Sequence, residues 1–141
     1  MAESEGRRSL TISWMFAALN SLEPFFANPA EVDFFIEGAE MKEKRRPGVV
    51  KCIRQRLEQL SNALGERNYL VGEWFTIADL MTASVLKILG HTDLLDDFPN
   101  LVAYRNRCLE RPAYKKAIAD QCADIARHTP SDMKYELRKK L

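Results

Sequence analysis

The stretch that decides the fold is Tyr69-Leu-Val-Gly-Glu-Trp-Phe-Thr-Ile-Ala-Asp-Leu80. Within it, Thr76 and Asp79 stand three residues apart before an apolar run, which is the spacing of a capping box. The Thr76 side chain can accept a hydrogen bond from the Asp79 N–H, and the Asp79 carboxylate can accept one from the Thr76 N–H. Phe75 and Leu80 occupy the positions of a hydrophobic staple. We therefore predict that a helix begins here and that Thr76 and Asp79 are structural. As a general base, Asp79 would have to give up these backbone donors.

Helical spacing of apolar residues continues on both sides of this stretch. Downstream, the spacing predicts a buried central helix that runs to Gly90 and carries Ile77, Leu80, Met81, Ser84, Val85 and Ile88. Upstream, steps of three and four predict a helix from Pro47 to Gly65 whose seam is Val50, Ile53, Leu57, Leu60 and Leu64. Pro99 and Pro112 each stand at the start of a further amphipathic segment. These segments predict the middle and the end of an all-helical chain.

The first apolar segment has two neighbouring helical stripes. One consists of Met15, Leu19, Leu22 and Phe26, and the other of Trp14, Ala18, Ser21 and Phe25. A helix with so wide an apolar face is buried on more than one side or meets a partner. Pro24 and Pro29 are expected to end or bend it near residues 24–28. Residues 30–36 fit a short helix or an extended turn, and residues 40–46 fit a charged connector.

Composition bounds the class of protein. The 141 residues suit one domain, and 21 basic against 20 acidic residues exclude a globally basic nucleic-acid binder. Six glycines, six prolines and no alternating run of strand length argue against an all-β fold. We expect an all-α fold, with five or six helices around one core.

Cysteine use and the ends of the chain favour the cytoplasm. Cys52, Cys108 and Cys122 are an odd set without a C-x-x-C pair, which indicates reduced thiols. The N-terminus lacks the apolar core of a signal peptide, and no apolar run approaches the roughly 18–20 residues that cross a bilayer. We therefore expect a cytoplasmic protein without a membrane partner.

Residues that could carry chemistry are few. Cys108, Cys122 and His128 match no zinc-site spacing and lack a fourth ligand, so we expect no metal site. His91 follows Gly90 at a predicted helix end, and we assign it no chemistry. Nucleophilic catalysis has little support without a serine or cysteine elbow.

A local basic cluster lies in the second quarter of the chain. It consists of Lys42, Lys44, Arg45, Arg46, Lys51, Arg54 and Arg56. Glu40, Glu43 and Glu58 dilute it. A solvated helix face and connector explain the cluster, and we do not expect a nucleic-acid partner, which would need interleaved aromatics and a larger charge excess.

Three stretches together resemble the C-terminal helical domain of cytosolic glutathione transferases of bacterial type. The first is the stretch quoted above, where Leu-x-Gly precedes a Thr-x-x-Asp capping box. The second is Pro-x-Leu-x-x-Tyr from Pro99, followed by Arg111-Pro-Ala-Tyr114, and the third is Trp14-Met-Phe-Ala-Ala-Leu-Asn-Ser-Leu-Glu-Pro24. The likeness spans residues 9 to about 122. It implies a bundle of the glutathione transferase C-terminal type in residues 9–127, with a polar linker or frayed start at 1–8 and a polar tail at 128–141.

The resemblance also implies a function for this domain. In the family, a thioredoxin-like N-terminal domain, absent from these 141 residues, holds the co-substrate glutathione and activates its thiol. The helical domain supplies an apolar pocket for the electrophile. By position, Trp14, Phe16 and Asn20 on the first helix are candidates for its wall, with packing as the alternative for the two aromatics. The resemblance names no catalytic residue here and no further cofactor.

Two functions follow from this resemblance. The chain is expected to be the electrophile-binding half of a glutathione transferase, inactive alone. The alternative is a non-catalytic protein-interaction module of the same fold. In either case the wide face of the first helix predicts a homodimer formed through that helix.

Overall fold

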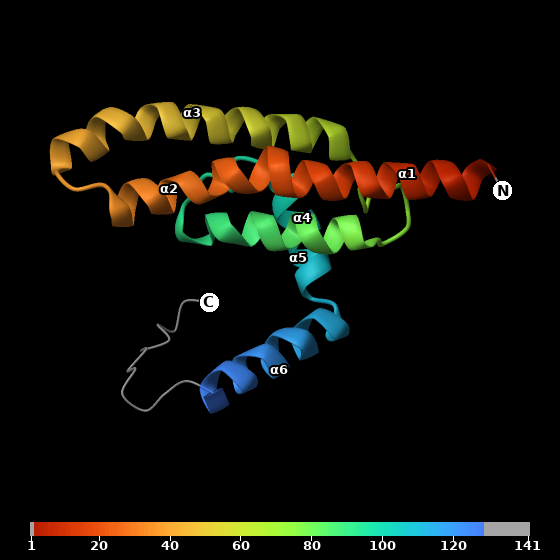
Figure 1. Cartoon of the computed structure of the whole chain (residues 1–141). Coiled ribbons are helices and arrows are strands. Elements are labelled where there is room, and N and C mark those ends of the chain that lie inside the picture. The colour runs from red at the N-terminus through yellow and green to blue at the C-terminus, as the bar shows by residue number, and fades with distance from the viewer. Residues whose placement is uncertain (1, 129–141) are drawn as a thin grey trace. The chain divides into compact units, whose positions relative to one another are not determined.

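The computed structural model describes residues 2–128, and every named element in that range is helical (Figure 1). In chain order these are α1 (Ala2–Ala17), the π-helical turn η1 (Ala18–Leu22), α2 (Glu23–Phe35), α3 (Ala39–Leu64), α4 (Ile77–Lys87), the 3₁₀ turn η2 (Ile88–His91), α5 (Pro99–Leu109) and α6 (Pro112–His128). The expected all-α fold is confirmed. Of the predicted tail, residues 129–141 lie outside the described residues.

The core lies around α4. This helix packs against α1, η1 and α2 on one side and against α5 on another. Ala78, Thr82, Ala83 and Leu86 are completely buried along it. The helix is central and has a buried face, as predicted, but among the residues that the sequence placed on it only Val85 is buried, and Ile77 and Ser84 are exposed. The last turn before Gly90 tightens into η2.

The first two helices and η1 form one uninterrupted helical run (Figure 1). Helix α1 begins at Ala2, so residues 2–8, expected to precede the first helix, are part of it. The helix does not end near residues 24–28, and the run continues through Pro24 and Pro29. The irregularity lies one turn earlier, where the Glu23 N–H donates to the carbonyl of Ala18, five residues back. Pro24 has no N–H to donate to the carbonyl of Asn20, which explains why the wider turn forms here.

The π-helical turn changes which stripe is buried. A π turn takes more residues than an α turn, so positions four apart stay in line across it. Ala18, Leu22 and Phe26 are buried in consequence, with Trp14 half-buried behind them. Leu19, which α-helical spacing placed on one of the two apolar stripes, is 45% exposed.

Helix α3 is longer than the sequence predicted. It begins at Ala39, so residues 40–46 are helical rather than a connector, and Pro47 lies inside it. The charged residues before Pro47 are good helix formers, and solvent can hydrogen-bond the carbonyl that the proline leaves unpaired. The helix ends as expected at Gly65, whose φ of +58° suits glycine. The Asn100 amide donates to the carbonyls of Ser61 at 3.1 Å and Gly65 at 3.3 Å, which ties the start of α5 to the end of α3.

The chain divides into two compact units after Leu109. The first unit holds α1 to α5. The second holds α6, which carries no buried residue, although Tyr114 and Ile118 are half-buried.

Candidate functional site

The capping box predicted at the start of α4 is present. The Thr76 N–H donates to Oδ2 of Asp79 at 2.8 Å, and the Thr76 hydroxyl donates to the same oxygen at 2.9 Å. Asp79 is completely buried. Thr76 and Asp79 therefore fix where α4 begins, as the sequence predicted.

The Asp79 carboxylate has two further partners that the capping motif does not reveal. Its Oδ1 accepts the backbone N–H of Leu70 at 2.8 Å and the hydroxyl of Tyr104 at 3.1 Å. One carboxylate thus joins the 69–75 loop, the start of α4 and the middle of α5. With both oxygens bonded and no solvent access, Asp79 organises the fold and has no lone pair directed at a substrate.

Tyr104 is held neutral in this network. Burial, and then the negative charge of Asp79, raise the pKa of the Tyr104 phenol well above its usual value of about 10. The phenol therefore keeps its proton and remains the donor to Asp79. In the sequence this partner is the tyrosine of the Pro-x-Leu-x-x-Tyr segment, 25 residues beyond Asp79.

Trp14 faces a different side of the first helical run from Phe16 and Asn20. Trp14 is half-buried and packs against the core. Phe16 is 64% exposed, and Asn20 is exposed as well. None of the three lines either of the two pockets formed by the described residues. Phe16 is the one that offers apolar surface to a ligand.

Phe16 belongs to an exposed apolar stripe. We define this stripe as Ile12, Phe16 and Leu19, which lie at helical spacing and are each at least 42% exposed. The loop before α4 lies beside α1, because the Arg7 guanidinium sits 5.3 Å from the ring centroid of Trp74. Trp74 is itself largely exposed. An uncovered stripe of this kind marks a surface for a ligand or a second protein surface.

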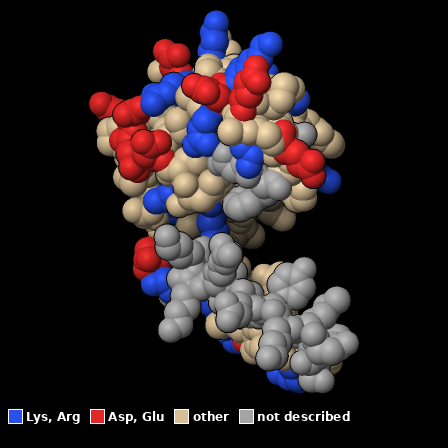
Figure 2. Space-filling view, turned by 90° about the vertical axis from the view of Figure 1, so that its left-hand side faces the viewer, with Lys and Arg blue, Asp and Glu red and all other residues tan. Residues whose placement is uncertain are grey.

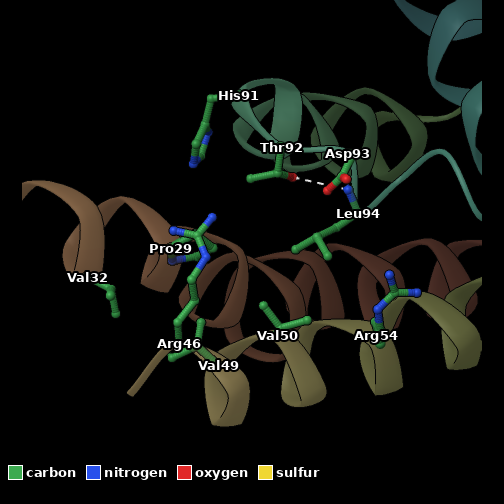
Figure 3. Close-up of a pocket in the computed structure, with 10 residues that line it drawn as sticks. All are labelled: Pro29, Val32, Arg46, Val49, Val50, Arg54, His91, Thr92, Asp93 and Leu94. Carbon is green, nitrogen blue, oxygen red and sulfur yellow. Dashed lines mark hydrogen bonds between the residues drawn. The ribbon is translucent and has the colours of Figure 1, made fainter. Parts of the chain in front are cut away.

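A cavity that the sequence did not reveal lies between α2, α3 and the turn at η2 (Figure 3). Its volume is about 450 Å³. No motif pointed to it, because its walls come from three separate segments. Three of its lining residues had been noted in the sequence: His91 after Gly90, to which no chemistry was assigned, and Arg46 and Arg54 of the basic cluster, which was interpreted as a solvated surface.

Two further observations bear on the predicted partners. Among the side chains that the structure describes, no three of His, Cys, Asp or Glu are grouped so as to hold a metal ion. Over residues 2–128, no helix has both the length and the apolar character needed to span a membrane.

Acidic side chains lie among the basic side chains in space, as they do in the sequence. On the face that includes the α2–α3 turn, Lys and Arg are interspersed with Asp and Glu (Figure 2). Mixed charge of this kind is typical of a solvated surface.

Residues 16–112 match the family model described as glutathione S-transferase, C-terminal domain. The chain belongs to this family. The comparison with curated proteins finds no match. Among solved structures, a glutathione transferase from Burkholderia graminis, with two glutathione molecules bound per subunit, is similar with a TM-score of 0.69 at 24% identity, covering 79% of this chain and 49% of that chain. A glutathione transferase from Phanerochaete chrysosporium, in complex with oxidised glutathione, has a TM-score of 0.69 at 18% identity, with coverages of 83% and 55%.

These likenesses establish the fold of the glutathione transferase C-terminal domain. The chain spans about half the length of the two solved structures. The predicted resemblance is confirmed for the helical domain.

Proposed function

We propose that this domain is the electrophile-binding half of a glutathione transferase-like protein, acting in the cytoplasm with glutathione as co-substrate. The observation that carries the proposal is the family match over residues 16–112. The exposed apolar stripe of Ile12, Phe16 and Leu19 supports it, since an apolar electrophile needs an apolar wall. In this proposal Phe16 contacts the electrophile, Asn20 lies at the edge of the site, and Trp14 supports the wall from the core side.

The 141-residue chain alone is proposed to be inactive. A free thiol has a pKa of about 8.5 and is mostly protonated at neutral pH, so conjugation requires a group that stabilises the glutathione thiolate. In the family this group lies in the thioredoxin-like domain. The one fully buried carboxylate of the described residues, Asp79, is committed to Leu70, Thr76 and Tyr104.

The test is glutathione binding by calorimetry, run beside a conjugation assay with 1-chloro-2,4-dinitrobenzene. The expected result is neither measurable binding nor turnover by the 141-residue chain. Saturable glutathione binding or catalysed conjugation would show that the helical domain holds glutathione by itself, which contradicts the proposal.

Electrophile binding is tested separately by tryptophan fluorescence. A Trp74→Phe background leaves Trp14 as the reporter, and an apolar aromatic compound is titrated in. We expect quenching that Phe16→Ala weakens and Phe35→Ala does not, because both rings are exposed but only Phe16 lies on the stripe. Equal effects of the two variants would exclude α1 as the wall.

The exposed stripe also favours a second candidate function, a protein-interaction module that forms a homodimer through α1. Burying a phenylalanine side chain contributes about 1.5–3 kcal/mol, so Phe16→Glu should weaken a dimer formed there. Sedimentation velocity over a range of concentrations would show self-association by the wild type and the Phe35→Glu control but not by Phe16→Glu. A wild type that stays monomeric at high concentration would contradict the dimer.

A further inference from the structure

The cavity between α2, α3 and η2 has an apolar wall. It is formed by Pro29, Val32, Val49, Val50 and Leu94. Leu94 belongs to the core cluster, and Val49 and Val50 pack against that cluster, so core packing holds the wall in place. The volume of about 450 Å³ lies within the range of ligand pockets, about 300–1,000 Å³. The cavity shares no residue with the exposed stripe on α1, so its occupant is a separate question from the proposed function.

Three polar side chains that line the cavity already have partners within the protein. Arg54 is ion-paired with Asp97. Arg46 also has an interaction of its own. The Thr92 hydroxyl donates to the carbonyl of Leu89 at 2.9 Å. A ligand that relied on a donor from one of these three residues would have to displace an existing partner, so these residues do not define the ligand.

His91 supplies a hydrogen-bond acceptor to the cavity. Its Nδ1 lies 2.9 Å from the carbonyl oxygen of Ile88. A carbonyl oxygen only accepts, so Nδ1 carries a hydrogen, and Nε2 of the neutral imidazole is then an acceptor. The imidazole reaches into the cavity from η2 (Figure 3). The carboxylate of Asp93, which also lines the cavity, likewise only accepts. The matching ligand therefore donates a hydrogen bond and carries no negative charge.

We propose that this cavity binds a small neutral phenol. The phenolic O–H donates to Nε2 of His91, and the ring with a short alkyl substituent lies against Val49, Val50 and Leu94. A phenol fits better than an aliphatic alcohol because its more acidic O–H donates the stronger hydrogen bond. With a pKa of about 10, as in the tyrosine side chain, a phenol still stays uncharged at neutral pH.

The experiment is a titration of the full chain with 4-propylphenol, followed by backbone amide shifts in NMR spectra at neutral pH. We expect saturable shifts at Val49, Val50, Thr92 and Leu94. The comparison ligand is 4-propylanisole, which has the same apolar body but a methyl ether in place of the O–H. The anion 4-propylbenzoate has no donor, and we expect it not to displace the phenol.

Matched variants assign the hydrogen bond to His91. In His91→Phe and His91→Ala, the ratio of the phenol affinity to the anisole affinity should fall about fivefold, which is the usual contribution of one hydrogen bond between neutral groups. Taking the ratio cancels the difference in hydrophobicity between the two ligands. His128→Phe changes the other histidine, which does not line the cavity, and should leave the ratio unchanged.

Circular dichroism confirms that each variant stays folded, and the two His91 variants serve as independent tests. The proposal is overturned by an absence of saturable shifts, by displacement of the phenol with 4-propylbenzoate, or by an unchanged affinity ratio in the His91 variants. An equal fall of the ratio in His128→Phe would also overturn it. So would shifts confined to α1, which would place the phenol on the exposed stripe of the proposed function instead.

Discussion

An Asp79→Asn substitution turns one oxygen of a completely buried carboxylate into an N–H donor and removes its charge. Every partner of that carboxylate is a donor: the N–H of Leu70, the N–H and hydroxyl of Thr76, and the hydroxyl of Tyr104. If the amide nitrogen takes the Oδ2 position, it faces the Thr76 N–H. If it takes the Oδ1 position, it faces the Leu70 N–H. In either orientation a backbone N–H, buried at Leu70 or part-buried at Thr76, loses its acceptor.

The magnitude follows from these contacts. A buried donor left without a partner costs about 1–3 kcal/mol, and the remaining hydrogen bonds lose the extra strength that a charged acceptor gives. We therefore expect the free energy of unfolding to fall by about 2–4 kcal/mol. For a domain whose total stability is about 5–15 kcal/mol, this is a large fraction.

Urea unfolding followed by far-ultraviolet circular dichroism measures the loss. Thr76→Ser is the matched control, because serine keeps the capping hydroxyl and should stay within about 0.5 kcal/mol of the wild type. An unchanged unfolding midpoint for Asp79→Asn would refute the reasoning. So would a Thr76→Ser variant that is destabilised as strongly as Asp79→Asn.

Three further predictions concern the helices. Leu22→Ala should lower the free energy of unfolding by about 2–5 kcal/mol and Leu19→Ala by less than about 1 kcal/mol. The reason is burial, since Leu22 is 5% exposed and Leu19 is 45% exposed. Thermal or urea unfolding that gave the reverse order would contradict the π-helical turn. Pro47→Ala should stabilise the chain by about 1–2 kcal/mol in the same assay, because it restores a helical N–H inside α3. A loss of stability would instead indicate that α3 begins at Pro47. Because the pKa of Tyr104 is raised in the folded state, the folded chain binds more protons than the unfolded chain above about pH 10, and stability falls as the pH rises. Unfolding free energies measured from neutral to alkaline pH should decline less steeply in Tyr104→Phe, and parallel declines would count against a buried phenol.

Local sequence signals predicted the parts of this fold whose causes are local. The start of α4 follows from the spacing of Thr76 and Asp79, and the end of α3 follows from Gly65. The buried positions of α5 follow from the helical period of Leu101, Tyr104 and Cys108. In each case a few neighbouring residues decide the conformation.

The features that the sequence did not reveal depend on contacts between distant segments. Helix α3 continues through Pro47 because packing against α2 and α5 along its length outweighs one missing hydrogen bond. The Leu70 and Tyr104 partners of Asp79 come from outside the capping motif. The cavity at His91 needs three segments to meet, and no periodicity within one segment encodes such a meeting.

The same limit applies to the candidate electrophile site. Family position suggested Trp14, Phe16 and Asn20, but helical geometry separates Trp14 from Phe16, since residues two apart face different sides. Only the exposure of each residue in the structure distinguishes a supporting side chain from one that can meet a ligand.

The π-helical turn at Ala18–Leu22 holds more residues than an α-helical turn would. Each residue of an α-helix advances the chain by about 100° around the axis. Deleting one residue from this turn, so that it closes as an α turn, would rotate all of α1 by about that angle relative to α2. The stripe that carries Phe16 would swing away from its present direction while the core around Phe26 kept its place. Because Trp14 and the contacts of α1 with α4 would turn with the helix, a single-residue insertion or deletion at this point would re-aim the outer surface and repack this side of the core together.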